Sequence, residues 1–378
     1  MIPLFKVAMA EDAPHMVGDV LASGWIGQGP RVEEFEDRLR ERLGTPHLAT
    51  VNCATSGLHL ALHMTAGAGR AARPGEPPEG EVLTTALTCT ATNWPILANG
   101  LPIRWVDVDP ATLNVDLDDL ARKISPATRA IVVVHWAGYP LDLDRLCGIL
   151  DAAEARHGFR PMVIEDCAHA WGSTYGGKPL GNQGNIAVFS FQAIKSLTTG
   201  DGGVVVFPTE ELAERAKILR WYGIDRRVPE GPRLAADIPE YGFKFHMNDI
   251  NATIGLANLP SVDARVARHQ ENAAYYDREL KGVPGLELTE RAEGRQSSCW
   301  LYTVLVEHRP EFEARMAERG IAVSQVHQRN DVYSVVRKSR APLPGLDRVA
   351  NRMVSIPVGW WVSDADREHI AETIRGGW

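Results

Sequence analysis

The sequence predicts an α/β protein with a large domain built on a mostly parallel sheet and a small α+β domain at its carboxyl end. Short apolar, β-branched runs alternate with longer stretches of helical periodicity, which is typical of parallel strands joined by right-handed crossover helices. From about Pro260 the composition becomes more charged. Because 378 residues suffice for two domains, we expect a large domain over 1–259, including a lead-in segment, and a small domain over 260–378.

Composition narrows the classes of function. A net charge of −8 argues against non-specific nucleic-acid binding, which needs a basic face. No apolar run approaches the roughly 20 residues of a membrane span, and the amino terminus lacks the pattern of a signal peptide. The five cysteines are scattered and have no metal-ligand spacing. We therefore expect a cytoplasmic protein that binds no nucleic acid, no membrane and no metal.

The first half of the chain is expected to alternate strands and helices. Apolar residues at helical spacing predict a helix over about 30–43, after a lead-in over 1–30. A segment over 66–80, rich in Gly, Pro and Ala, is predicted to be a surface loop. The other elements expected here are a strand over 47–52 followed by a helix, a strand ending at Thr85, a helix from near Thr90, a strand within 102–108, a helix over 117–124, a strand over 130–134, a helix over 141–157 and a strand over 161–165.

The second half begins with two buried strands. Apolar runs over 187–191 and 204–207 flank a turn-rich stretch that contains Lys195. The later elements expected are a helix over 247–259 that opens at Asn248, a long helix over 261–281, a strand over 299–306 and helices over 310–319 and 364–375.

Lys195 follows a buried strand and is a candidate covalent amine. Burial disfavours the charged form of lysine and lowers its pKa. A neutral amine can attack a carbonyl and form a Schiff base. The alternative is an ordinary surface lysine beside a hairpin.

Asp166 stands at the carboxyl end of the strand over 161–165. Ligands of open α/β sheets bind at this end of the strands. A carboxylate there can pair with a cationic ring nitrogen, and pyridoxal 5'-phosphate (PLP) needs such a partner to act as an electron sink. Asp166 and Lys195 together therefore indicate a PLP site.

The turn Ala54-Thr55-Ser56-Gly57 offers a place for an anion. Small residues at the start of a helix leave backbone amides open, and a phosphate is the favoured guest. An ordinary helix cap is the alternative.

Three motifs in the same order resemble one known family. IEDCAHA, AVFSFQAIKSLTTGDGG and the early GWIGQGPRVEEFE are similar to segments of the DegT/StrS sugar aminotransferases, which are fold-type I PLP-dependent transferases. The resemblance covers nearly the whole chain. It implies transfer of an amino group, most often from L-glutamate, to a keto group of a nucleotide-linked deoxysugar. Some relatives carry histidine at the position of Lys195 and act as deoxygenating dehydratases, so the lysine favours transamination.

The resemblance also assigns roles to residues. Lys195 and Asp166 become the catalytic pair. The cofactor-binding residues that it implies are Lys195, Asp166, His169 near the phenolic oxygen, and Thr55, Ser56 and Ser190 at the phosphate.

Two positions depart from the family pattern. Cys89 stands where relatives place an aromatic ring on the cofactor face, and Trp94 and Trp136 are the two candidates to compensate. Lys244 replaces an asparagine that reaches the phosphate in the neighbouring subunit. A lysine can bind phosphate as a point charge and so keep this role. If Lys244 crosses the interface as its counterpart does, the resemblance implies a homodimer with shared active sites. A solvated loop lysine is the alternative.

Four residues are candidates for substrate contacts: His135, His327, Arg329 and Arg226. A structural strand-end role for His135 stays open. Two other functions also stay open: an aminotransferase acting on a cyclitol or other small ketone, and a non-catalytic PLP-binding regulatory protein.

Overall fold

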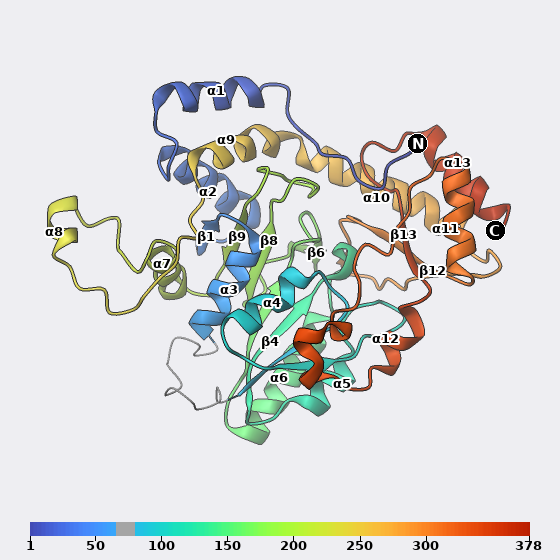
Figure 1. Cartoon of the computed structure of the whole chain (residues 1–378), viewed down its shortest axis with the longest axis horizontal. Helices are drawn as coiled ribbons and strands as arrows, with labels where there is room; N and C mark the ends of the chain where they lie inside the picture. Colours follow the sequence, from blue (N-terminus) through green and yellow to red (C-terminus); the bar gives the residue numbers. More distant parts are fainter. Residues whose placement is uncertain (66–79) are drawn as a thin grey trace.

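The computed structural model describes residues 1–65 and 80–378, and it is built around a seven-stranded sheet (Figure 1). The strand order is β1-β9-β8-β5-β4-β2-β3. The strands are β1 Leu48–Val51, β2 Glu81–Thr85, β3 Ile103–Val106, β4 Thr128–Val134, β5 Met162–Asp166, β8 Ile186–Ser190 and β9 Gly203–Val206. Each matches a predicted strand to within a few residues. The loop predicted over 66–80 lies, except for Gly80, outside the described residues.

The sheet is mostly parallel, as predicted. Strands β3, β2, β4, β5 and β8 run in one direction. Strand β9 is antiparallel to both of its neighbours, β8 and β1. Strand β1 therefore runs parallel to β8, and both end at the same edge of the sheet as β5.

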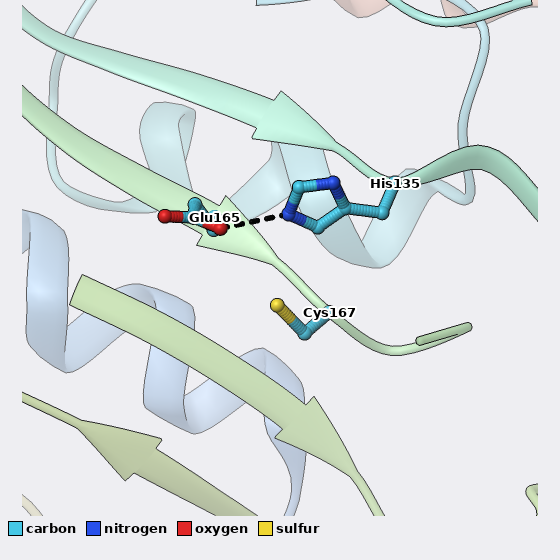
Figure 2. Close-up of side chains that lie close together, drawn as sticks. All are labelled: His135, Glu165 and Cys167. Carbon is cyan, nitrogen blue, oxygen red and sulfur yellow. Dashed lines mark hydrogen bonds and ion pairs between the residues drawn. The ribbon is translucent and has the colours of Figure 1, made fainter. Parts of the chain in front are cut away.

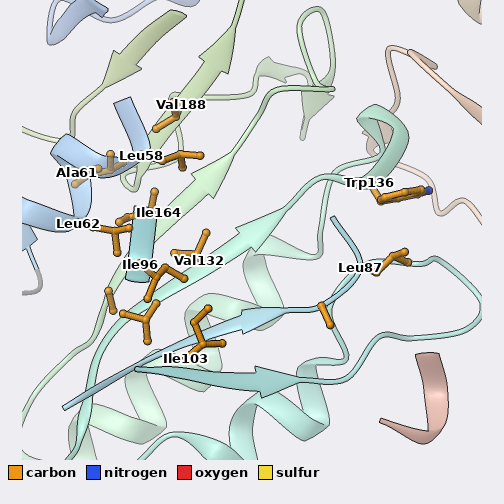
Figure 3. Packing of buried hydrophobic residues seen from close by; sticks show 14 of the residues in the cluster. Leu58, Ala61, Leu62, Leu87, Ile96, Ile103, Val132, Trp136, Ile164 and Val188 are labelled. Atoms are coloured by element: carbon orange, nitrogen blue, oxygen red, sulfur yellow. The ribbon is translucent and has the colours of Figure 1, made fainter. Parts of the chain in front are cut away.

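Helices cover both faces of this sheet. On one face, apolar residues of α3 (Ala54–Thr65), α4 (Thr90–Ala98) and α7 (Glu210–Leu219) pack against the strands. Figure 3 shows part of this cluster, with Leu58 and Ile96 from the helices beside Val132, Ile164 and Val188 from the strands. The other face is covered by α2 (Pro30–Leu43), α5 (Leu117–Lys123), α6 (Leu143–His157) and α9 (Asp249–Asn258).

The carboxyl-terminal part has a sheet and an apolar core of its own. Strands β10 (Leu286–Leu288), β12 (Tyr302–Val306) and β13 (Met353–Ile356) form a three-stranded sheet. Helices α10 (Val262–Glu279), α11 (Arg309–Glu318) and α13 (Asp364–Arg375) pack on it. Ile2 pairs with Ile321, so the start of the chain joins this part. The domain boundary near residue 259 stays a prediction.

Several short elements were not predicted. Helix α1 (Ala13–Ser23) lies inside the expected lead-in, and only two of its residues are buried. The other elements outside the predictions are α8 (Glu230–Leu234), α12 (Pro344–Val349), β6 (Thr174–Tyr175), β7 (Lys178–Pro179) and β11 (Arg295–Gln296), together with α7, β10 and β13. Most of these elements have six residues or fewer, and periodicity is weak over so few residues. Helix α7 has ten residues and was overlooked.

The structure bears on membrane insertion and on disulfide bonds. Among the described residues, no helix combines the length and the apolar character that crossing a bilayer requires. All five cysteines carry free thiols.

Candidate active site

Three strand ends and one helix start meet at one edge of the large sheet. Asp166 is the last residue of β5 and Ser190 is the last residue of β8. Gly203 of β9 pairs with both Ser190 and Val51, the last residue of β1. Helix α3 begins just after β1, so its first turn lies at the same edge. The fold thereby brings Asp166, Ser190 and the amino end of α3 together.

The Asp166 carboxylate is buried and held by two donors. Thr92 Oγ1 of α4 donates to Oδ2 at 2.7 Å, and the Ala168 amide donates to Oδ1 at 2.9 Å. Burial raises the pKa of Asp166, while these two hydrogen bonds and the charge of Lys195 lower it in part. Burial and the hydrogen bonds therefore shift the pKa of Asp166 in opposite directions.

Lys195 lies in the turn that follows β8, where its amide donates to Gln192 O at 2.9 Å. Desolvation lowers the pKa of Lys195 from 10.5 to about 7, against the attraction of Asp166. The residue as a whole is half-buried, and its Nζ lies 3.5 Å from the centroid of the Trp300 ring. Within the described residues no carboxylate forms an ion pair with this amine. A neutral amine near pH 7 is a nucleophile, as the sequence predicts for Lys195.

An aromatic cluster surrounds the amine. Trp300 stacks on His169 with 4.1 Å between ring centroids, and His169 lies parallel to His327 at 5.6 Å. Trp136 meets both histidines edge-on. Burial and the nearby Lys195 lower the pKa of His169 well below its ordinary value and that of His327 to about 4. Both imidazoles are therefore neutral at pH 7.

Each of these two histidines has a buried ring nitrogen that forms no hydrogen bond within the described part of the chain. Among the described residues, neither His169 Nδ1 nor His327 Nε2 has a hydrogen-bond partner. Buried polar atoms without partners are uncommon in folded proteins, and a bound ligand is one way to satisfy them. The predicted contacts of His169 with cofactor and of His327 with substrate remain predictions that this geometry allows.

The two tryptophans proposed to compensate for Cys89 lie in different places. Trp136 contacts the histidine cluster, whereas Trp94 packs edge-on against Tyr333 and lines a separate groove. Cys89 directly precedes α4 and is one of the titratable groups near Lys195. The geometry thus favours Trp136 over Trp94 beside the reacting amine.

Hydroxyl groups gather where a phosphate is expected. Thr55 and Ser56 lie in the first turn of α3, where helix amides have no partners within the helix. Thr55 is exposed, and Ser56 Oγ contacts Cys53 Sγ at 3.2 Å. Ser190 Oγ accepts the Gln192 amide at 3.3 Å, which leaves its own proton free to donate.

His135 has no ring nitrogen left for a substrate. Figure 2 shows it beside Glu165 and Cys167, where Nε2 lies 2.8 Å from Glu165 Oε2. The Leu141 amide donates to Nδ1 at 3.0 Å, so the ring proton is on Nε2 and is donated to Glu165. Asn185 donates to the other Glu165 oxygen at 2.7 Å. These bonds account for the cluster without a metal and favour the structural role for His135.

The two arginine candidates are already paired. Arg329 forms two hydrogen bonds of 2.7 Å to Asp331, and these raise its pKa. Arg226 is exposed, donates to Gln28 O at 3.2 Å and lies over the Trp221 ring. Their substrate contacts stay predictions.

Lys244 is also exposed, and its backbone pairs with that of Trp221. Lys244 and Arg226 therefore border the same tryptophan at the surface.

Sequence reasoning missed Thr92 and Trp300. Thr92 belongs to the predicted helix near Thr90, but nothing in its local sequence pointed to Asp166. Trp300 precedes β12, and its Nε1 donates to Ile194 O at 3.1 Å beside Lys195. Both contacts join segments far apart in the chain, and no local pattern reports them.

Comparison with known proteins decides the family. A model of the DegT/DnrJ/EryC1/StrS aminotransferase family matches residues 7–375. The chain belongs to this family.

Solved structures agree with the assignment. The sugar aminotransferase CalS13 from Micromonospora echinospora is 55% identical, with 100% of both chains covered and a TM-score of 0.95. AtS13 from Actinomadura melliaura is 58% identical over 100% of this chain and 99% of that one, also with a TM-score of 0.95. The PLP form of Spr1654 from Streptococcus pneumoniae is 28% identical over 99% and 98% of the two chains, with a TM-score of 0.88. This family member is thus a PLP-dependent aminotransferase with the fold-type I architecture.

The residues present fit PLP. Asp166 offers a buried carboxylate, Lys195 an amine with a pKa of about 7, and His169 a buried nitrogen without a partner. Hydroxyls and helix amides at the start of α3 suit the phosphate. When bound, PLP supplies an electron sink for the carbanion formed beside the transferred nitrogen.

Proposed function

We propose that this aminotransferase moves an amino group from L-glutamate to a keto group of a nucleotide-linked deoxysugar. The observation that carries the proposal is the Lys195 amine, with its pKa lowered to about 7, at the strand edge that also holds Asp166. The similarity to the sugar aminotransferase CalS13 over the full chain supports a sugar as acceptor.

Each residue has a role in this proposal. Lys195 holds the cofactor and, once released, carries a proton between the substrate carbon and the cofactor. A pKa near 7 suits this task, because such an amine gives and accepts a proton with equal ease near neutral pH. Asp166 keeps the proton on the ring nitrogen. Thr55, Ser56 and Ser190 bind the phosphate, and His169 and Cys89 line the cofactor.

The proposal includes a homodimer with shared active sites. Lys244 is exposed next to Trp221, and in this proposal it binds the phosphate in the neighbouring subunit. Trp25 is 74% exposed and Leu234 is 82% exposed, which is unusual for such large apolar side chains. Burying them between subunits gives a physical reason for association. Free thiols on all five cysteines support a cytoplasmic location.

Two other functions remain as alternatives. The same chemistry can serve a cyclitol or another small ketone, since the cofactor residues do not depend on the acceptor. A non-catalytic PLP-binding regulator is the second alternative. Its biological output would survive Lys195→Ala, whereas the output of an enzyme would not.

An acceptor screen tests the proposal. The protein is first treated with L-glutamate, so that the bound cofactor carries the amino group. Nucleotide-linked keto sugars, keto cyclitols and simple ketones are then added separately, and the rate at which the PLP form returns is measured. We expect the nucleotide-linked sugars to react at least about tenfold faster, because the binding energy of the nucleotide helps to orient the ketone. Preference for a keto cyclitol would contradict the sugar assignment and leave the transamination intact.

A further inference from the structure

A chain of buried hydroxyl groups leads to Asp166. Thr92 Oγ1 lies 2.7 Å from Asp166 Oδ2, and Thr88 Oγ1 lies 2.7 Å from Thr92 Oγ1. All three side chains are almost completely buried. Hydrogen bonds in such surroundings are stronger than in water and polarise one another.

When Asp166 is ionised, the hydroxyl groups of this chain can donate their hydrogen bonds in only one direction, toward the carboxylate. A carboxylate only accepts, so the single hydroxyl proton of Thr92 is donated to Asp166. Thr92 then has only lone pairs for Thr88, so Thr88 must donate to Thr92. The oriented chain points its positive ends toward the carboxylate and favours the charged form.

Burial opposes what the cofactor requires from Asp166. A neutral Asp166 would take the proton that belongs on the ring nitrogen, and the electron sink would be lost. Burial raises the pKa of Asp166, and the bond from Thr92 is the first of the influences that lower it again. The titratable groups that face Asp166 are Lys195 from the turn after β8, His135 from the end of β4 and Cys167, the residue that follows Asp166.

Asn330 fixes the segment that carries Thr88. Its side chain donates to the Thr88 carbonyl at 2.9 Å, and its amide donates to the Ala86 carbonyl at 2.8 Å. Asn93 donates to the Asn330 side-chain oxygen at 2.9 Å. The hydroxyl chain is therefore held rigidly, from the strand edge to the segment that bears His327.

We propose that Thr92, supported by Thr88, is a positioning residue that keeps Asp166 ionised, so that the ring nitrogen of the bound cofactor retains its proton. The proposal rests on the assignment of Asp166 as the partner of that nitrogen. Thr92 acts through Asp166 and does not itself touch the cofactor or the substrate.

The protonation of the ring nitrogen can be followed directly. Holoprotein is prepared with PLP labelled with ¹⁵N in the ring, and the nitrogen resonance is recorded against pH for the native protein and Thr92→Val. Valine keeps the shape of threonine and removes the donor. We expect the midpoint to fall by about one pH unit, a tenfold weaker hold on the proton, because a hydrogen bond to a charged group is lost.

Matched variants make the result specific. Thr92→Ser keeps the hydroxyl and should retain the native midpoint, while Thr88→Val should lower it by a smaller amount. Thr253→Val removes a buried hydroxyl that has no partner among the described residues, and it should change nothing. If Thr92→Val does not fold or bind PLP, Thr88→Val decides the question.

The outcomes separate the inference from the site assignment. The role of the hydroxyl chain would be overturned if the pH midpoint of the ring-nitrogen resonance stayed native in Thr92→Val, or in Thr88→Val where that variant replaces it. Asp166→Asn is measured alongside. If it also leaves the resonance unchanged, Asp166 is not the partner of the ring nitrogen, and the proposed site is wrong as well.

Discussion

At the scale of single residues, the amine of Lys195 has the most consequential environment. Desolvation, rather than a neighbouring cation, is the main cause of its low pKa. Its contact with the Trp300 ring offsets only part of the lost hydration. The cofactor-free protein therefore holds a lysine whose charged form is unfavourable in the folded state.

This environment predicts a pH-dependent stability. The pKa of Lys195 is about 7 in the folded protein and 10.5 in the unfolded chain, so the unfolded chain holds an additional proton between these values. The penalty is fully present below pH 7 and disappears as pH rises to 10.5. We expect cofactor-free Lys195→Met to be more stable than the native protein at about pH 6, with a smaller difference at about pH 9.

Urea unfolding at the two pH values checks this expectation. Lys6→Met, at an exposed lysine far from Lys195 in sequence, serves as a control for the loss of one charge. If Lys195→Met changes the free energy of unfolding by the same amount at both pH values, the low pKa of Lys195 is incorrect.

The positions of Lys195 and Asp166 at strand ends could be predicted because the signal is local, while their roles stay predictions. Lys195 and Asp166 each follow a recognisable strand, and their motifs carry the family resemblance. Thr92 and Trp300 reach the same site from distant segments, so no spacing in the chain reports their contacts. The bonding of both His135 nitrogens likewise depends on a backbone amide and on Glu165 of the next strand.

At the scale of elements, α2 and α9 depend on one another through Asp249. This buried carboxylate accepts the amides of Gly29 at 2.8 Å, Val32 at 3.1 Å and Arg31 at 3.3 Å. Gly29 precedes α2 and has no side chain to cap it. Asp249 therefore caps α2 from a distant part of the chain while it sits in the first turn of α9.

Removing this cap should be costly. We expect Asp249→Ala to lower the free energy of unfolding by about 2–4 kcal/mol, because buried amides at a helix start lose a charged acceptor. Asp263→Ala removes an exposed carboxylate that pairs with Arg42 and should cost less than about 1 kcal/mol. Urea denaturation measures both, and equal losses would contradict the capping role.

The same contact explains the limits of prediction for elements. The bounds of α2 follow from its apolar spacing and agree with the structure, but the cap comes from Asp249 and is invisible in the local sequence. Helix α1 carries apolar residues at helical spacing, among them Ala13, Val17 and Val20, and was overlooked inside the expected lead-in. Strand β10 has only three residues, which is too few for alternation to identify it.

At the scale of the whole molecule, the proposal requires two copies of the chain. In the proposed dimer, each active site takes Lys195 from one subunit and Lys244 from the other. Lys195→Ala and Lys244→Ala therefore remove contributions that come from different subunits. Mixed dimers of the two variants contain one site with both defects and one site with neither. After complete exchange of equal amounts, about half of the dimers are mixed, and each of these has one native site. We therefore expect mixing to restore about a quarter of the native activity per site, whereas each variant alone stays inactive or impaired.

Subunit exchange followed by an activity assay provides the measurement. Mixtures of Lys195→Ala with an Asp166→Asn variant serve as the control, because both residues belong to one subunit's site and no native site forms on mixing. Absence of recovery with Lys244→Ala, despite proven exchange, would show that Lys244 does not act across the interface.

In the proposed function, Lys195 and Asp166 form a PLP site that accepts an amino group. The most direct test is the absorbance spectrum of the purified protein before and after excess L-glutamate. We predict a visible band from PLP joined to Lys195, and its loss in favour of a band at shorter wavelength as the amino group is transferred. No visible band after addition of PLP would contradict the cofactor site, and a band that ignores glutamate would contradict glutamate as the donor.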